Sequence, residues 1–191
     1  MERECIISCI QDNIDIHNAL LNNQQLHKKI SILVDKIVSA INNGGKIVTC
    51  GNGGSASDAL HFTGEIVGRF QKERVAFPAV CLNAEVATMT AIANDYGFEF
   101  IFSRQVEGLV NSGDIFIGIS TSGNSKNIYS AMEMARQKGA FSVALTGRDG
   151  GALAGMADIS IVIPADNTAR IQECHILIIH IICEMVEEKL T

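Results

Sequence analysis

Residues 50–65, CGNGGSASDALHFTGE, combine a glycine-rich loop with an imidazole and a carboxylate four residues apart. A helix over the second half of this stretch places His61 and Glu65 on the same face, one turn apart. Imidazole and carboxylate groups can take up and release a proton near neutral pH, which is the chemistry of general acid–base catalysis. The glycines before them indicate a backbone that approaches a bound group closely. The stretch therefore predicts a site that binds a ligand and then moves a proton on it.

A second set of polar side chains lies near the C-terminus. Gln172 and His180 belong to residues 169–190, which are otherwise apolar on almost every side. A single histidine there would be interpreted as a buried packing residue that is hydrogen-bonded to a neighbour. With Gln172 on the same predicted helix and Glu65 as a partner, His180 becomes a candidate for aldose–ketose isomerisation. In that reaction a base removes a proton from the carbon beside a carbonyl, an enediol forms, and an acid protonates the carbonyl oxygen.

Two loops follow apolar strands and precede helices, at residues 51–55 and 120–125. Four of the six residues in the second loop carry hydroxyl groups. At the carboxyl edge of a parallel sheet, hydroxyls and the unpaired amides of a helix N-terminus form a donor cluster that suits a phosphate without requiring lysine or arginine. Serines that only cap helices and glycines that only form turns are the simpler interpretation. The presence of two such loops favours a phosphate site.

The first loop also fits the loose dinucleotide pattern GxGxxA at Gly51, Gly53 and Ala56. That kind of site requires an acidic residue at the end of the second strand to hold the ribose. Glu73 precedes the second predicted strand, and Glu85 follows it too late. The sequence also lacks the GxxxxGK[ST] motif of nucleotide hydrolases. We therefore expect no nucleotide cofactor.

Short β-branched runs alternate with helical stretches over most of the chain. The predicted strands are residues 46–50, 79–82, 114–120, 141–146 and 158–163, and the predicted helices between them include 55–70, 98–110 and 125–138. Near-continuous apolar strands that alternate with helices indicate a parallel sheet covered on both faces. The expected fold class is α/β, with a doubly wound five-stranded parallel sheet.

Helices are predicted at both ends of the chain. Residues 1–43 form an N-terminal helical pair, whose second member carries an apolar stripe between Leu26 and Ile41. Residues 44–191 form the α/β core, so 1–191 is expected to be a single domain. A C-terminal helix over 169–190 that is apolar on all sides is normally buried, and a sister subunit is one source of the second covering surface. We therefore expect a homo-oligomer.

Composition limits the classes of function. The chain has 191 residues and a net charge of -6, which argues against a nucleic-acid or anionic-membrane surface. Its apolar runs fall short of the roughly 20 residues that span a membrane. The six cysteines form no CxxC pair and are expected to be reduced packing residues in a cytoplasmic protein.

The motifs, taken in order, resemble those of a known family. CGNGGSA, HFTGE, AIAND, STSGNS, ALTGRDGG and ARIQE, followed by His180, resemble the sugar isomerase (SIS) domain family and, within it, the phosphoheptose isomerases. The resemblance covers essentially the whole chain. It implies a flavodoxin-like sheet and a homotetramer with active sites at subunit interfaces. It also implies conversion of D-sedoheptulose 7-phosphate into D-glycero-D-manno-heptose 7-phosphate, toward heptose for lipopolysaccharide, capsule or another surface glycan.

The resemblance implies roles for individual residues. Glu65 and His180 would be the acid–base pair. The substrate would contact Asn52, Gly53, Gly54, Ser55, Glu65, Asn94, Asp95, Ser120, Thr121, Ser122, Ser125 and Gln172. One zinc ion per subunit would be held by His61, Glu65, Gln172 and His180. Glutamine is a poor zinc ligand, and eight residues of one helix separate Gln172 and His180 by about 12 Å. Both reach one ion only by leaning together or by coming from different subunits.

Other functions are compatible with the same fold, because a fold does not determine its chemistry. Arabinose 5-phosphate isomerases usually append a regulatory domain, and sugar-phosphate-sensing regulators add a DNA-binding domain. A further rival is a non-catalytic SIS scaffold that associates with a replication initiator. That scaffold lacks counterparts of Glu65 and His180, which are both present here.

Overall fold

The computed structural model describes residues 2–191. In chain order its elements are α1 (Glu2–Leu21), α2 (Gln24–Asn42), β1 (Ile47–Gly51), α3 (Gly54–Val67), β2 (Ala79–Cys81), α4 (Val86–Asp95), the 3-10 helix η1 (Phe98–Phe100), α5 (Ser103–Leu109), β3 (Ile115–Ser120), α6 (Lys126–Gln137), β4 (Phe141–Gly147), α7 (Gly151–Met156), β5 (Ile159–Ile163) and α8 (Thr168–Leu190).

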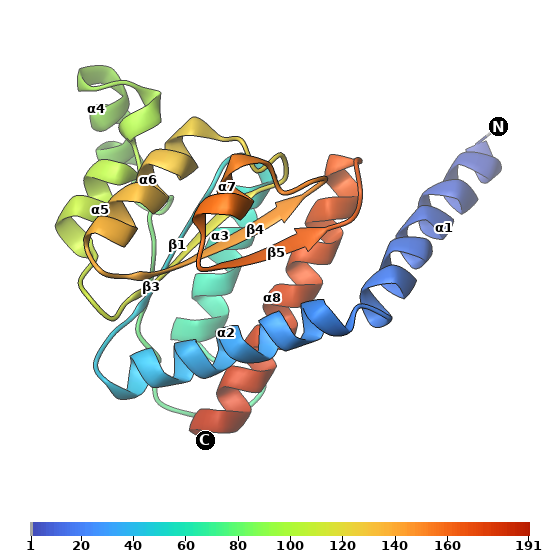
Figure 1. Ribbon diagram of the computed structural model, residues 1–191, viewed down its shortest axis with the longest axis horizontal. Coiled ribbons are helices and arrows are strands. Elements are labelled where there is room, and N and C mark those ends of the chain that lie inside the picture. The colour runs from blue at the N-terminus through green and yellow to red at the C-terminus, as the bar shows by residue number, and fades with distance from the viewer. Residues whose placement is uncertain (1) are drawn as a thin grey trace.

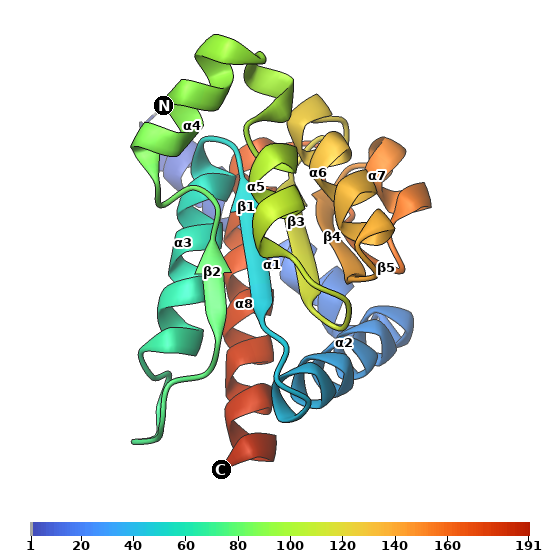
Figure 2. The ribbon, with the colours of Figure 1, turned by 90° about the vertical axis from the view of Figure 1, so that its left-hand side faces the viewer.

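The five strands form one parallel sheet in the order β2-β1-β3-β4-β5 (Figure 2). Each strand begins and ends within one residue of its predicted bounds, so the sheet and its flavodoxin-like order are confirmed. The strand order reverses between β1 and β3. Ligands of doubly wound sheets bind in the crevice outside the carboxyl ends of the strands at such a reversal. The two loops singled out in the sequence follow these two strands.

Helices cover both faces of the sheet, as its apolar strands require. Neighbouring residues of β1 point to opposite sides, so that Ile47 belongs to one hydrophobic core and Val48 to the other. The first core is closed by α2, α3 and α8, and the second by α5, α6 and α7 (Figures 1 and 2). Helices α3 and α8 therefore lie on the same face of the sheet. Helix α3 is close to β1 and β3, the strands that the two loops follow, and α8 packs against α3.

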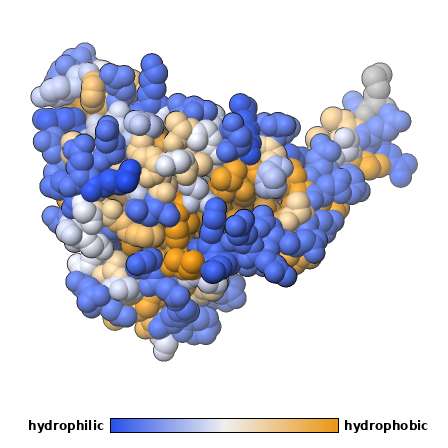
Figure 3. Space-filling view, viewed as in Figure 1, coloured by the Kyte–Doolittle hydropathy of each residue, from blue (hydrophilic) through white to orange (hydrophobic). Residues whose placement is uncertain are grey.

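The N-terminal helices behave differently from each other. In α2 the apolar stripe packs into the first core, with Leu33 and Ile37 fully buried. In contrast, α1 projects from the body (Figure 1) and buries only Leu20 among its described side chains. Apolar side chains remain exposed along this arm and where it meets the body (Figure 3). Ile6 and Ile10, for example, are 61% and 56% exposed.

The C-terminal helix α8 buries one face in the first core, whereas its other face is partly or fully exposed. Ile178, Ile179 and Ile182 are at most 1% exposed, whereas Leu177 is 37% exposed. Leu177 lines an apolar groove of about 320 Å³ between α8, α1 and α2. Within residues 2–191, α8 and the other helices are too short or too polar to cross a membrane.

Three regions depart from the predicted elements, and one of them is the short helix α7, which was not predicted. The helix expected over 98–110 is divided into η1 and α5, because Ile101 and Phe102 turn into the second core and interrupt it. Helix α4 was not predicted; it has no fully buried residue, and only Met89, Ile92 and Ala93 pack, partly buried, against the second core. The six cysteines are all free thiols; four are buried as expected, whereas Cys5 and Cys9 are exposed on α1.

Candidate active site

Asn83 holds the glycine-rich loop after β1 in place. The amide of Gly51 donates to Oδ1 of Asn83 (3.0 Å), and Nδ2 of Asn83 donates to the carbonyl of Gly51 (2.9 Å). A Cβ atom at Gly51 would lie 2.2 Å from the carbonyl oxygen of Ser55, so a larger residue cannot be accommodated there. Gly53 has a φ of 57°, in the left-handed region that glycine tolerates. This tight turn brings the N-terminus of α3, with Ser55 buried, to the edge of the sheet.

Serine hydroxyls gather in the loop after β3. Ser120 Oγ lies 2.9 Å from Ser125 Oγ and 3.4 Å from Ser122 Oγ. Gly123 permits the turn, because its φ is 65° and a Cβ there would lie 2.0 Å from a carbonyl oxygen in the loop after β4. Hydroxyl groups rotate and can each donate to an anion. The structure therefore brings together three of the four loop hydroxyls predicted to contact substrate; the fourth, on Thr121, is partly buried beside them.

An asparagine pair joins the two loops. Nδ2 of Asn52 donates to Oδ1 of Asn127, and Nδ2 of Asn127 donates to Oδ1 of Asn52, both over 2.8 Å. With Ser125 and Lys126 they line a cavity of about 510 Å³, whose other wall is residues 97–99. This volume is in the range of small-molecule sites. Asn127 and Lys126 were missed in the sequence, although their place in the first turn after the serine loop was a signal. The sequence predicted a phosphate site without lysine or arginine, whereas the structure places the cation of Lys126 on the wall of this cavity.

Three titratable side chains meet where α3 lies against α8. His61 Nε2 is 3.1 Å from Glu65 Oε1 and 3.1 Å from His180 Nε2. The two imidazole rings are tilted, with centroids 5.0 Å apart. The side chains of His61 and Glu65 are 44% and 26% exposed, so a ligand can reach them. We call His61, Glu65 and His180 the α3–α8 cluster; it contains both residues of the predicted acid–base pair.

Gln172 lies farther along the same helix–helix contact. Its amide covers Gly54, where an ideal Cβ atom would lie 2.4 Å from Gln172 Nε2. Gly54 and His61 are seven residues apart, or about 10 Å along α3. The structure therefore places Gln172 beside the glycine-rich loop, about two helical turns from the α3–α8 cluster. Its predicted place among the zinc ligands stays a prediction.

Asn94 and Asp95 end helix α4, which stands above the carboxyl edge of the sheet (Figure 2). Both side chains are exposed, and Nδ2 of Asn94 donates to Oδ1 of Asp95 (2.9 Å). Neither lines the cavity between the two loops. Their contact with substrate therefore also stays a prediction.

Known proteins are similar to this chain in sequence. The SIS domain family matches residues 15–147. The phosphoheptose isomerase of Geotalea daltonii is 46% identical over 187 residues, which are 97% of each chain. That of Geobacter sp. strain M21 is 51% identical over 166 residues, covering 87% of this chain and 86% of the relative. The chain belongs to the SIS domain family, among its phosphoheptose isomerases.

A solved structure supports the same membership. The phosphoheptose isomerase from Francisella tularensis is 41% identical and superimposes with a TM-score of 0.94, covering 98% of this chain and 99% of that one. The α/β fold predicted for this SIS domain is thereby confirmed. The agreement extends to α1 and α2, because the superposition spans nearly the whole chain.

Asp58 is a polar residue of this SIS domain that the sequence analysis did not single out. It lies on α3 one turn after Gly54 and one turn before His61, on the same face. Its Oδ2 atom is buried and has no hydrogen-bond partner in the described part of the chain. Burial raises the pKa of Asp58 to about 6, and the nearby His61 offsets part of that rise. The helical spacing from Gly54 to Glu65 was the signal that could have found it.

His175, which was also not predicted, holds a strand that ends next to the site. It is fully buried on α8, and its Nε2 lies 3.1 Å from the carbonyl oxygen of Thr146 at the end of β4. Burial lowers the pKa of His175 to about 4, although the hydrogen bond to Thr146 acts in the opposite direction. Thr146 pairs with Ser120 in the sheet. A neutral imidazole therefore supports the strand end beside the serine loop of this SIS domain.

The donors of the α3–α8 cluster fit zinc in their chemistry and spacing. Neutral imidazole and carboxylate are zinc ligands, and two ligands about 2.1 Å from a tetrahedral ion are roughly 3.4 Å apart. The two separations of 3.1 Å at His61 are close to that value. Over residues 2–191, however, no group of three or more His, Cys, Asp or Glu side chains is already arranged as a metal site. Small side-chain movements are thus needed before these three residues can share one ion.

Proposed function

We propose that the protein is an aldose–ketose isomerase that converts D-sedoheptulose 7-phosphate into D-glycero-D-manno-heptose 7-phosphate, for surface glycans such as lipopolysaccharide or capsule. The observation that carries this proposal is the contact of His61 with both Glu65 and His180, in a chain about half identical to phosphoheptose isomerases. A non-catalytic scaffold has no use for such a pair. Relatives that match over nearly their whole length favour a heptose over another sugar phosphate.

The two loops bind the phosphate end of the substrate in this proposal. The hydroxyls of Ser120, Ser122 and Ser125 and the first amides of α3 supply hydrogen bonds. Lys126, on the cavity wall, supplies a positive charge. An anchored phosphate restricts the sugar to a few orientations, and this lowers the entropic part of the barrier.

Glu65 and His180 move the protons. One of them removes the proton from the carbon beside the ketose carbonyl, the C–H electrons form the double bond of an enediol, and the carbonyl oxygen takes a proton from the other. A proton is then delivered to the former carbonyl carbon while the neighbouring hydroxyl loses its proton. The aldose results and both side chains return to their first protonation states. The reaction is balanced without an external oxidant or reductant.

One zinc ion per subunit is part of the proposal, held by His61, Glu65 and His180; Gln172, the further expected ligand, lies about two helical turns away in the same chain and would join them from a different subunit. When bound, zinc would polarise an oxygen of the substrate. The donor set and the spacings of 3.1 Å support this assignment. Metal analysis of the purified protein tests it, since His61→Ala should lower the zinc content whatever its effect on activity.

A homotetramer with sites shared between subunits is also proposed. Glu65 lies eleven residues after Gly54, about 16 Å along α3, so the loops and the α3–α8 cluster of one chain are well separated. A neighbouring subunit can bring its own loops or cluster closer. The exposed apolar face of α1 and the groove beside Leu177 support such contacts.

The proposed setting is the cytoplasm, with no nucleic-acid or membrane partner. Six free thiols are compatible with a reducing compartment. A net charge of -6 gives no general attraction to nucleic acid or anionic lipid.

Isotope exchange in heavy water tests the proposed reaction directly. The parent protein should incorporate deuterium at the carbon beside the substrate carbonyl while aldose forms. Glu65→Gln keeps the side-chain shape, so it should abolish the exchange and leave binding of the phosphate nearly unchanged. Exchange by this variant at the parent's rate would show that Glu65 is not the proton-transfer group, and a parent without exchange would favour the scaffold.

A further inference from the structure

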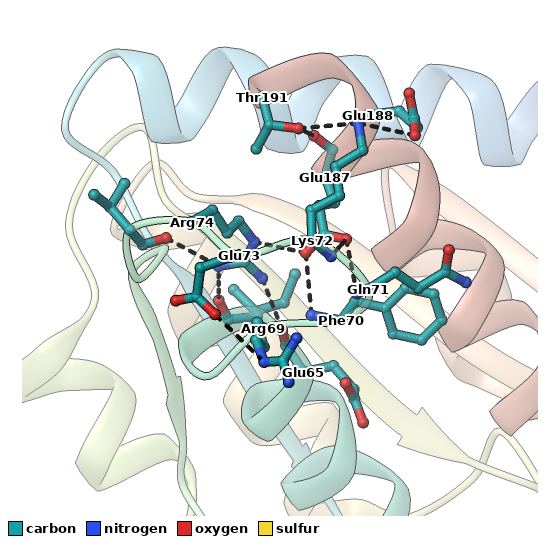
Figure 4. A network of polar contacts seen from close by, with 12 residues as sticks. Glu65, Arg69, Phe70, Gln71, Lys72, Glu73, Arg74, Glu187, Glu188 and Thr191 are labelled. Carbon is teal, nitrogen blue, oxygen red and sulfur yellow. Dashed lines mark hydrogen bonds and ion pairs between the residues drawn. The ribbon is translucent and has the colours of Figure 1, made fainter.

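A buried carboxylate lies two turns beyond His180 on α8. The side chain of Glu187 is 3% exposed and accepts hydrogen bonds from the amides of Phe70 (3.1 Å), Gln71 (2.8 Å) and Lys72 (2.8 Å) (Figure 4). Burial by itself would raise the pKa of Glu187. The three amides and an arginine side chain outweigh it and lower the pKa to about 2. Glu187 is therefore charged at neutral pH and fixes the segment that follows α3.

Arg74 continues the network from Glu187 to Glu65. Its Nε donates to Glu187 Oε1 (2.8 Å), and its Nη2 donates to the backbone carbonyl of Glu65 (2.9 Å). Its Nη1 donates to the carbonyl of Ile66 (3.1 Å). The last carbonyls of a helix have no partners within the helix, and a cation there is favourable. Arg74 thus caps the end of α3 at the residue that carries the proposed catalytic carboxylate.

Phe70 connects the same network to His180. Its amide donates to Glu187, and its ring lies beside the His180 imidazole, with centroids 5.7 Å apart. Glu187 therefore reaches Glu65 through Arg74 and reaches His180 through Phe70. One branch thus ends at the backbone of Glu65 and the other at the imidazole ring of His180.

We propose that Glu187 and Arg74 are positioning residues that hold Glu65 and His180 in register for proton transfer. This inference rests on the proposed isomerase function. Neither residue contacts a side chain of the α3–α8 cluster: Arg74 acts through the backbone carbonyl of Glu65, and Glu187 acts through Arg74 and Phe70. Displacement of a catalytic group by about 1 Å can lower a rate by about 100-fold, so a loosened network should slow the chemical step without releasing the substrate.

The chain offers a matched control for this network. Asp114 is also a buried carboxylate, 3% exposed, that accepts from two amides, of Lys46 (2.9 Å) and Asn111 (2.8 Å), and from a cation, Lys46 Nζ (2.6 Å). These partners precede the amino ends of β1 and β3. Asp114→Asn therefore removes a similar network at a place that does not lead to Glu65 or His180.

The test compares Arg74→Lys and Glu187→Gln with Asp114→Asn by steady-state isomerisation of sedoheptulose 7-phosphate and by thermal unfolding, with assays well below each melting temperature. We expect kcat to fall about 10- to 100-fold in the first two variants, with KM within about twofold of the parent. Asp114→Asn should lose stability and keep the parent kcat. Phe70→Leu is the second variant if Glu187→Gln does not fold, and it should also lower kcat at constant KM.

The outcome separates the two proposals. Parent-like kcat in Arg74→Lys and Phe70→Leu, or the same loss in Asp114→Asn, would show that the network is only structural. A parent protein without isomerase activity would instead overturn the proposed function, before any variant is compared.

Discussion

The two loops at the sheet edge and the α3–α8 cluster contain different kinds of polar groups. The loops present hydroxyls, amides and glycine-dependent turns, with Ser120 and Ser125 in contact. The α3–α8 cluster consists of titratable side chains, with His61 between Glu65 and His180. The first region can hold an anion without changing its own charge, and the second can exchange protons. Substitutions in the two regions should therefore change different kinetic parameters.

His180→Gln should have the largest effect. The amide keeps hydrogen-bonding ability and loses proton transfer, so kcat should fall by about 1,000-fold, within the range for a general acid or base. KM should change by no more than about threefold, because the loops are intact. Steady-state kinetics check this. A rise in KM with parent-like kcat would show that the α3–α8 cluster binds the substrate and does not take part in proton transfer.

Ser120→Ala should have the next largest effect, in the other parameter. A hydrogen bond to a charged group contributes about 1.5–3 kcal/mol, so KM should rise about 10- to 100-fold while kcat stays within a few fold. Ser57→Ala, an exposed position on α3, is the control and should match the parent. Equal loss in kcat and kcat/KM for Ser120→Ala would erase the distinction between the two regions.

The smallest expected effect is on the pH dependence of the free energy of unfolding. It arises from Asp58 and His175, whose pKa values are shifted in opposite directions. Between about pH 4 and 6 unfolding adds a proton to His175, whose folded pKa is about 4, and removes one from Asp58, whose folded pKa is about 6. These changes oppose each other. In Asp58→Asn only His175 remains, so the unfolded state binds more protons and stability falls as pH decreases, by at most about 1.4 kcal/mol per unit.

Urea unfolding of the parent and Asp58→Asn at several pH values from 4 to 7 measures this difference. Near pH 7 the two stability curves should run parallel, with Asp58→Asn the more stable because it lacks the buried charge, and below about pH 6 they should converge as Asp58 of the parent takes up a proton. Glu187, with its pKa lowered to about 2, loses its contribution in both proteins below its ordinary pKa, so the comparison isolates Asp58. Curves that stay parallel over the whole range would mean that Asp58 ionises alike in the folded and unfolded chains.

Much of the fold followed from the sequence, because buried parallel strands leave a clear pattern. Ile115–Ser120 is apolar on both faces and is fully buried, and the α2 stripe packs as its spacing indicates. Helix α4 left a weaker pattern, since only Met89, Ile92 and Ala93 pack against the second core and none of them is fully buried. Short elements such as α7, with Leu153 as its buried residue, also lack enough turns to show a period.

The site, like the fold, was predicted only in part. The loops and the pair of Glu65 and His180 were predicted because unusual residue types occur there in recognisable motifs. The roles of Asn127, Glu187 and Arg74 depend on contacts over 75 or more residues, or on a segment without regular structure. A glutamate near the end of an apolar helix looks like a solvated residue until the amides that it accepts from are located in space.

Helix α1 has a thermodynamic consequence of its own. Twenty residues that bury only Leu20 among the described side chains gain little from tertiary packing, and an isolated helix of that length is marginal in water. If neighbouring subunits cover its apolar face, the ordering of the arm and the assembly of the protein become one coupled equilibrium. Dilution should then reduce the helical signal in circular dichroism, by mass action.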